Sequence, residues 1–125
     1  MPIPRIVPYL ESADFDAVKS FYVDTLGLEV AMEDPDIPNF LGLSSPDNPS
    51  AQIVVSGEGV EQPMPDFGVD LGSVAAVDAA HEAAVQDGRE VVYPLSDEPW
   101  GIHRFFVRDP TGAVVNVLAH IQAPS

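Results

Sequence analysis

The histidines and carboxylates are the side chains of this sequence best suited to hold a metal ion or to move protons. There are three histidines, His81, His103 and His120, and 20 acidic residues against five Lys and Arg. Cysteine is absent, so disulfide bonds and thiolate metal sites are excluded. Serine, histidine and aspartate are all present, but no spacing brings them together, and a nucleophile activated by a neighbouring base is not indicated.

Each histidine is interpreted through the element that carries it. His81 lies on the apolar stripe of a predicted helix, where we expect a residue at the edge of the core or at an interface. His103 precedes Arg104 on a predicted strand, and its ring could equally line a pocket or face solvent. His120 shares strand parity with Asn116 and lies four residues beyond it, about 13 Å along the strand, too far for both to bind one ion. We expect His120 at the rim of a pocket or near the chain end.

Composition and charge restrict location and partners. The 125 residues, 46% of them hydrophobic, suit one domain with its own core. The first residues lack the apolar run of a signal peptide, and no stretch approaches the roughly 20 residues of a membrane span, so we expect a cytoplasmic protein. The net charge of −15 argues against nucleic acid and membrane partners. It predicts either a solvated surface that aids solubility or a field that attracts a cationic ligand.

A repeated helix must help to position these side chains. Apolar residues spaced by three and four predict one helix over 14–26 and a second over 73–87. The apolar positions are Phe15, Val18, Tyr22 and Leu26 in the first helix and Val74, Val77, His81 and Val85 in the second. A constant shift of 59 residues relates the two sets. Asp14 and Ser73 can cap the helix starts, and a glycine follows each helix.

Strand-like segments surround each helix in the same order. We expect strands near 3–10, 28–33, 40–43, 51–56, 66–71, 90–95, 102–108 and 113–119. The tract 57–65, rich in glycine and proline, is predicted to link a first module, about 1–57, to a second, about 66–125. The chain is thus predicted to be one α+β domain, 1–125, of two tandem β-α-β-β-β modules. They should form a curved mixed sheet with a concave cleft and helices outside.

Two motifs resemble those of the vicinal oxygen chelate superfamily, which includes glyoxalases, bleomycin-resistance proteins and extradiol dioxygenases. The first motif is Asp14, Phe21-Tyr22 and Leu26-Gly27, and the second is Trp100-Gly101, Phe105, Asp109-Pro110-Thr111-Gly112 and Asn116. The resemblance covers nearly the whole chain and implies the same modular fold. It does not define an activity, because one fold hosts many functions.

The resemblance also implies four positions where metal-using relatives place ligands, usually His, Glu or Gln. They fall at Val7, Gln52, Asp66 and Asn116. Valine has no lone pair, the two amides offer only neutral oxygens, and Asp66 is the one anion. A catalytic divalent cation normally has about three good protein donors. We therefore expect no metal and no other cofactor.

Strand alternation extends this set to a candidate cleft. If Val7 faces inward, Tyr9 does too, whereas Ile6 and Leu10 should pack under a helix. Trp100 and Phe40 lie on or near loops that could cover the mouth. The expected cleft residues are Val7, Tyr9, Gln52, Asp66, Trp100, His103 and Asn116.

The leading hypothesis is a metal-free protein that binds a small molecule, similar to bleomycin-resistance members and suited to sequestering a cationic or aromatic compound. The alternative is a metal-dependent lyase, isomerase or dioxygenase of the same superfamily. Metal-free catalysis with Asp66 or His103 as general base, and a structural or regulatory subunit with a vestigial cleft, also remain open. The resemblance further implies a homodimer.

Overall fold

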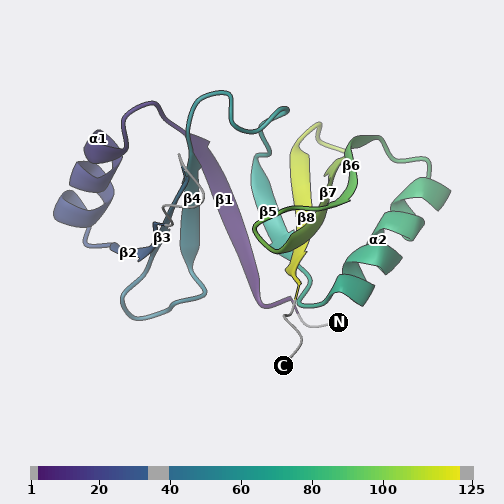
Figure 1. Cartoon of the computed structure of the whole chain (residues 1–125), viewed down its shortest axis with the longest axis horizontal. Helices are drawn as coiled ribbons and strands as arrows, with labels where there is room; N and C mark the ends of the chain where they lie inside the picture. The colour runs from purple at the N-terminus through teal and green to yellow at the C-terminus, as the bar shows by residue number, and fades with distance from the viewer. Residues whose placement is uncertain (1–2, 34–39, 122–125) are drawn as a thin grey trace.

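The computed structural model describes residues 3–33 and 40–121, and these form the predicted pair of modules (Figure 1). The first module contains β1 (Arg5–Glu11), α1 (Phe15–Lys19), η1 (Ser20–Thr25), β2 (Glu29–Met32), β3 (Phe40–Ser44) and β4 (Gln52–Ser56). The second contains β5 (Phe67–Asp70), α2 (Val74–Gln86), β6 (Val91–Asp97), β7 (Ile102–Arg108) and β8 (Val114–His120). No helix in the described ranges is long and apolar enough to cross a membrane.

The eight strands make one curved mixed sheet in the order β2-β3-β4-β1-β5-β8-β7-β6. Within each module the first strand pairs in parallel with the last, β1 with β4 and β5 with β8. The modules join edge to edge through the antiparallel pairing of β1 and β5, in which Val7 lies opposite Gly68. The concave face of the sheet therefore belongs to a single chain.

Alternation along the strands assigns one face to the helices and the other to the concave side. Under α2 the core contains Val77 with Phe105, Val115 and Val117, and under α1 it contains Leu41, Leu43 and Val55. Asn116, which alternates with Val115 and Val117, therefore points to the concave side. Figure 1 shows the two helices at opposite ends of the sheet with β1 between them.

The first helix differs from the prediction in its second half. After Lys19 the α-helix widens into the π-helical η1, and Leu26 N–H donates to the carbonyl of Phe21, five residues back. This extra residue per turn rotates Leu26 out of the predicted stripe, leaving it 58% exposed, while Val23 joins the core. Val85 at the end of α2 is likewise exposed.

The expectation that Ile6 and Leu10 pack under a helix is wrong. Their side chains lie on the outer face of β1, where they are 59% and 39% exposed. The reason is visible in Figure 1, because α1 and α2 cover the two ends of the sheet and leave the outer face of β1 bare. An apolar strip on this strand is therefore open.

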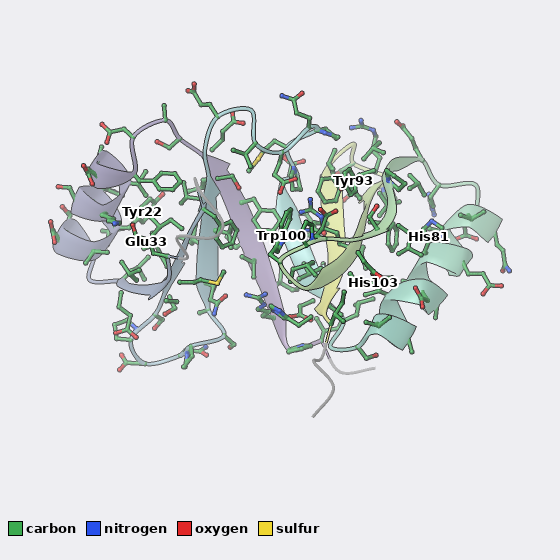
Figure 2. All side chains as sticks on the ribbon, in the orientation of Figure 1. Tyr22, Glu33, His81, Tyr93, Trp100 and His103 are labelled. Carbon is green, nitrogen blue, oxygen red and sulfur yellow. The ribbon has the colours of Figure 1, made fainter. Side chains whose placement is uncertain are left out.

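The expectation of His103 as a cleft residue is also wrong. On β7, His103 has the same parity as the core residue Phe105, so its side chain faces α2 and not the concave side. Figure 2 shows it between the sheet and α2. Its Nε2 lies 2.6 Å from Asp78 of α2, and its Nδ1 lies 2.5 Å from Asp97 of β6. Two carboxylates on opposite ring nitrogens favour the doubly protonated ring. Burial lowers the pKa of His103, but the hydrogen bonds to Asp97 and Asp78 outweigh it and raise the pKa above 6.5.

This contact predicts a fold whose stability falls at alkaline pH. Because the pKa of His103 is raised in the folded protein, its stabilising contribution is complete below pH 6.5 and is lost as pH rises through the folded pKa. Urea unfolding followed from pH 5 to 9 should show the fall, and His103→Gln should flatten it. An unchanged pH dependence in His103→Gln would contradict the prediction. Asp78→Asn should give an intermediate profile.

Candidate functional site

Four residues line up across the middle of the concave face. Val7 pairs with Gly68, and Gly68 pairs with Asn116 on β8. On the other side, Tyr9 pairs with Val54, so Gln52 continues the line beyond Val7 by the same parallel register. We call Gln52, Val7, Gly68 and Asn116 the central row. It contains one position from each of β4, β1, β5 and β8, the four strands on which the resemblance places ligands.

Asp66 is not part of this row. It precedes β5, its side chain is exposed, and its carboxylate accepts a hydrogen bond from Val114 N–H at 2.8 Å. Its backbone carbonyl accepts from Tyr9 N–H at 3.0 Å. The expected position on β5, counted back from the helix cap Ser73, was two residues too early. The reason is that Leu71 and Gly72 separate the end of β5 from Ser73. The position on β5 belongs to Gly68.

The phenol of Tyr9 occupies the centre of the central row. A Cβ added to Gly68 would lie 2.6 Å from Tyr9 Oη and 3.0 Å from its Cζ, so the ring lies directly against the glycine backbone. Asn116 Nδ2 donates to Tyr9 Oη at 2.9 Å. Burial raises the pKa of Tyr9 against the opposing effects of the Asn116 hydrogen bond and of Arg5 and Arg104. Tyr9 is thus a neutral phenol at physiological pH.

These residues do not fit a divalent metal ion. The central row offers a valine, a glycine and two neutral amides, and a phenol fills the space in front of them. One of the amides, Gln52, already accepts from Arg5. Within residues 3–33 and 40–121, no group of three or more His, Asp or Glu is placed to hold a metal ion. A divalent ion would need anionic or imidazole donors here, and the row supplies neither.

An aromatic cluster around Arg104, from β6, β7 and the turn between them, lies next to the row. The Cζ atom of Arg104 is 4.9 Å from the ring centroid of Phe106, 5.0 Å from that of Tyr93 and 5.4 Å from that of Trp100. Figure 2 shows Tyr93 and Trp100 over the second module. Trp100 remains 42% exposed, whereas Arg104 is buried. The cluster therefore has an open aromatic surface above a covered cation.

The positive charge of Arg104 is balanced by two neighbouring carboxylates. Its Nη atoms make two bonds of 3.1 Å to the carboxylate of Glu61, from the linker, and its Nε lies 3.5 Å from Glu98. Burial lowers the pKa of Arg104, but the hydrogen bonds and charges of these carboxylates raise it overall. Arg104 stays a cation with fixed anionic partners.

A second arginine, Arg5, lies at the start of β1 on the concave side. Its Nε lies 3.1 Å from Asp70, another N–H group donates to Gln52 Oε1, and a third nitrogen lies 3.2 Å from His120 Nε2. His120, the last residue of β8, thus lies beside Arg5. Neither arginine was among the expected cleft residues, although strand alternation carried a signal for both. Arg5 shares parity with Val7, and Arg104 shares parity with Phe106 opposite Asn116.

The structure brings together five of the expected cleft residues and excludes two. Val7, Tyr9, Gln52 and Asn116 meet at the central row, and Trp100 lies beside it on the Arg104 cluster. Asp66 is not in the row, because it precedes β5 and its carboxylate bonds Val114 N–H, and His103 lies on the face toward α2. The role of the remaining five in ligand binding stays a prediction.

The contact between Tyr9 and Gly68 predicts a strong coupling between the two positions. Gly68→Ala should destabilise the fold by about 1–3 kcal/mol, because the new methyl group overlaps the phenol. In a Tyr9→Val background the same alanine should cost much less, since the obstructing ring is gone. Urea unfolding of the wild type, both single variants and the double variant measures this coupling. Additive effects of the two changes would contradict the described contact.

Comparisons with known proteins agree with this geometry. The chain resembles a protein described as NAD-dependent benzaldehyde dehydrogenase from Legionella pneumophila (TM-score 0.74, 13% identity, covering 92% of this chain and 98% of the other). It also resembles methylmalonyl-CoA epimerase from Mycobacterium tuberculosis (0.70, 17%, 98% and 90%). Homoprotocatechuate 2,3-dioxygenase from B. fuscum, represented by its H200Q variant, matches over 99% of this chain and 35% of its own length (0.65, 22%).

At these identities the solved structures establish the fold alone. A search of curated proteins finds no match. The decisive comparison is with a family described as Glyoxalase/Bleomycin resistance protein/Dioxygenase superfamily, which matches residues 6–117, from within β1 to within β8. That span includes both modules, the linker and the whole central row, so the chain belongs to the glyoxalase/bleomycin resistance protein/dioxygenase superfamily.

Proposed function

We propose that this protein is a metal-free small-molecule-binding member of its superfamily, which sequesters its ligand on the concave face. The observation that carries the proposal is the Tyr9 phenol, held against Gly68 by Asn116 in front of the central row. Neutral amides and a phenol can orient a bound compound by hydrogen bonds, but they do not polarise it as a cation would. Dioxygenase or epimerase activity of the kind named for similar structures is therefore the weaker candidate.

The surroundings of the row support a ligand with an aromatic or cationic group. Trp100 offers a partly exposed ring beside the row, on which a flat compound can stack. The net charge of −15 raises the local concentration of cations around the protein. Of the expected bases, His103 faces α2 and the carboxylate of Asp66 is bonded to Val114 N–H, which weakens the case for metal-free catalysis.

The proposal predicts that the purified protein binds no stoichiometric metal. Protein prepared without chelator should contain far less than one Zn, Ni, Mn or Fe per chain by elemental analysis. Adding EDTA or any of these ions should leave the melting temperature unchanged, since a bound ligand would raise it.

A redesigned variant provides the positive control for that measurement. Val7→His, Tyr9→Val, Gly68→His and Asn116→Glu together supply imidazole and carboxylate donors and clear the phenol from the row. This variant, checked for folding by circular dichroism, should bind zinc. One tightly held metal ion per chain in the wild type would refute the proposed function.

We also propose a homodimer, on the basis of the family resemblance. The bare strip on β1, where Ile6 and Leu10 are exposed, is an apolar surface that a second copy can cover. Light scattering should give twice the mass of one chain, and Ile6→Glu should reduce it to one. Val85→Glu, an equally exposed apolar position on α2, is the matched control and should not change the mass. A monomeric wild type would contradict the dimer.

A further inference from the structure

The linker between the two modules contains an exposed segment that is fixed at both ends. This segment, residues 58–63, is called the strap below. Gly57 before it and Pro65 after it are buried, whereas every residue of the strap except Glu61 is exposed. Because the strap contributes few buried contacts to the fold, it can lift from the sheet while β4 and β5 stay in place.

Two contacts tie the strap to the strands. Among the described residues, Gly59 N–H donates to Glu11 Oε2 at 3.2 Å, and the two Nη atoms of Arg104 donate to Glu61 at 3.1 Å each. The contact with Arg104 is the stronger one, because both groups are charged and the planar guanidinium matches a carboxylate with two parallel hydrogen bonds. Glu61 therefore holds the strap closed.

The position of Glu61 shows how an anion reaches Arg104. The Nη atoms of Arg104 face the strap, whereas its Nε lies 3.5 Å from Glu98. The side chain of Glu61 is 16% exposed and that of Arg104 is 8% exposed, so the carboxylate approaches the guanidinium from the solvent side. When the strap lifts, the volume of this carboxylate opens to solvent, and the Nη atoms lie at its floor.

The surroundings of this volume suit a flat ring that carries a carboxylate. The guanidinium group lies among three aromatic rings, and Trp100, at 5.4 Å, is the one that is largely exposed. A ligand carboxylate can take the place of the Glu61 carboxylate on both Nη atoms, while the attached ring stacks on Trp100. Glu61 itself has no ring, so the ligand gains a contact that the strap lacks.

Charge at the site favours an anionic ligand over a neutral or cationic one. Glu98 stays beside Arg104 when Glu61 leaves, so exchanging one carboxylate for another leaves the local charge unchanged. A cation would meet the guanidinium group directly, and a neutral compound would leave it with one carboxylate fewer. The net charge of −15 repels anions at long range, but physiological salt screens exposed charges beyond about 8 Å.

We propose that the strap is autoinhibitory and that Glu61 occupies a binding site for an aromatic carboxylate. The ligand displaces Glu61 from the Nη atoms of Arg104, and its ring lies on Trp100. This inference rests on the proposed metal-free binding function, to which it adds a ligand class and a means of control.

Four probes test the proposal by calorimetric titration of the full chain. They are 2-naphthoate, the neutral 2-naphthamide, the non-aromatic cyclohexanecarboxylate and the cation 1-methylquinolinium. We expect 2-naphthoate to bind most tightly and to change the emission of Trp100, the only tryptophan. It should also raise deuterium uptake in residues 58–63, because it displaces the strap. A ligand that docked on the closed strap would lower that uptake or leave it unchanged.

A variant of the strap gives a second test with a distinctive sign. Glu61→Gln should bind 2-naphthoate about tenfold more tightly than the wild type, because the internal carboxylate no longer competes and the open fraction rises. Glu58→Gln makes the same charge change at an exposed position of the strap and should not alter the affinity. Arg104→Lys should weaken binding about tenfold, since it loses the paired donors.

The outcomes separate this inference from the function on which it rests. Equal affinity of the wild type and Glu61→Gln for 2-naphthoate, or no binding to either, would overturn the inference. If Glu61→Gln does not fold, unchanged deuterium uptake in the strap of the wild type overturns it instead. Tight binding of 1-methylquinolinium without binding of 2-naphthoate would overturn it and leave the metal-free binding function standing. A stoichiometric metal ion in the same preparation would overturn both.

Discussion

The ring of Tyr9 can lie across the joined modules only because residue 68 has no side chain. The edge-to-edge pairing of β1 with β5 places Gly68 next to Val7, and the phenol takes the volume that any larger residue at 68 would fill. Asn116 is then oriented by its bond to the phenol oxygen. The chemical character of the central row, which combines an apolar residue with neutral hydrogen-bonding groups, follows from this one packing arrangement.

The charges on the concave face differ from those of the chain as a whole. The protein has five basic residues against 20 acidic ones, yet Arg5 and Arg104 both lie on the concave side. Each is compensated by carboxylates within 4 Å, so the ion pairs hold strands and linker together without leaving a strong local field. The acidic excess belongs mainly to the outer surface, where it is solvated and screened by salt.

Much of the architecture was predictable because local patterns and the global repeat agree. Helix caps, turn glycines and apolar periodicity all pointed to the same two modules, and the order of elements is confirmed. The errors arise where a position was counted along the sequence through a segment that departs from regular helix or strand geometry. The π-helical turn displaced Leu26, and the Leu71-Gly72 link displaced the count at Asp66 by two residues.

The candidate site was only partly predictable, for a different reason. Strand parity correctly grouped Val7 with Tyr9 and Gln52 with Asn116, since alternation is a property of the backbone. It cannot say that one tyrosine lies sideways over a glycine of another module, because that depends on contacts between residues far apart in sequence. His103 shows the same limit, since the carboxylates that hold it come from α2 and β6.

The bond between Arg104 and Glu61 bears on how the two halves can have diverged. If the halves arose by duplication of one ancestral unit, the shift of 64 that matches Asn116 to Gln52 matches Arg104 to Phe40, so the arginine is specific to the second copy. Its carboxylate partner sits in the tract between the copies, outside either repeat. Shortening that tract would remove Glu61, one of the two carboxylates that balance the buried guanidinium of Arg104.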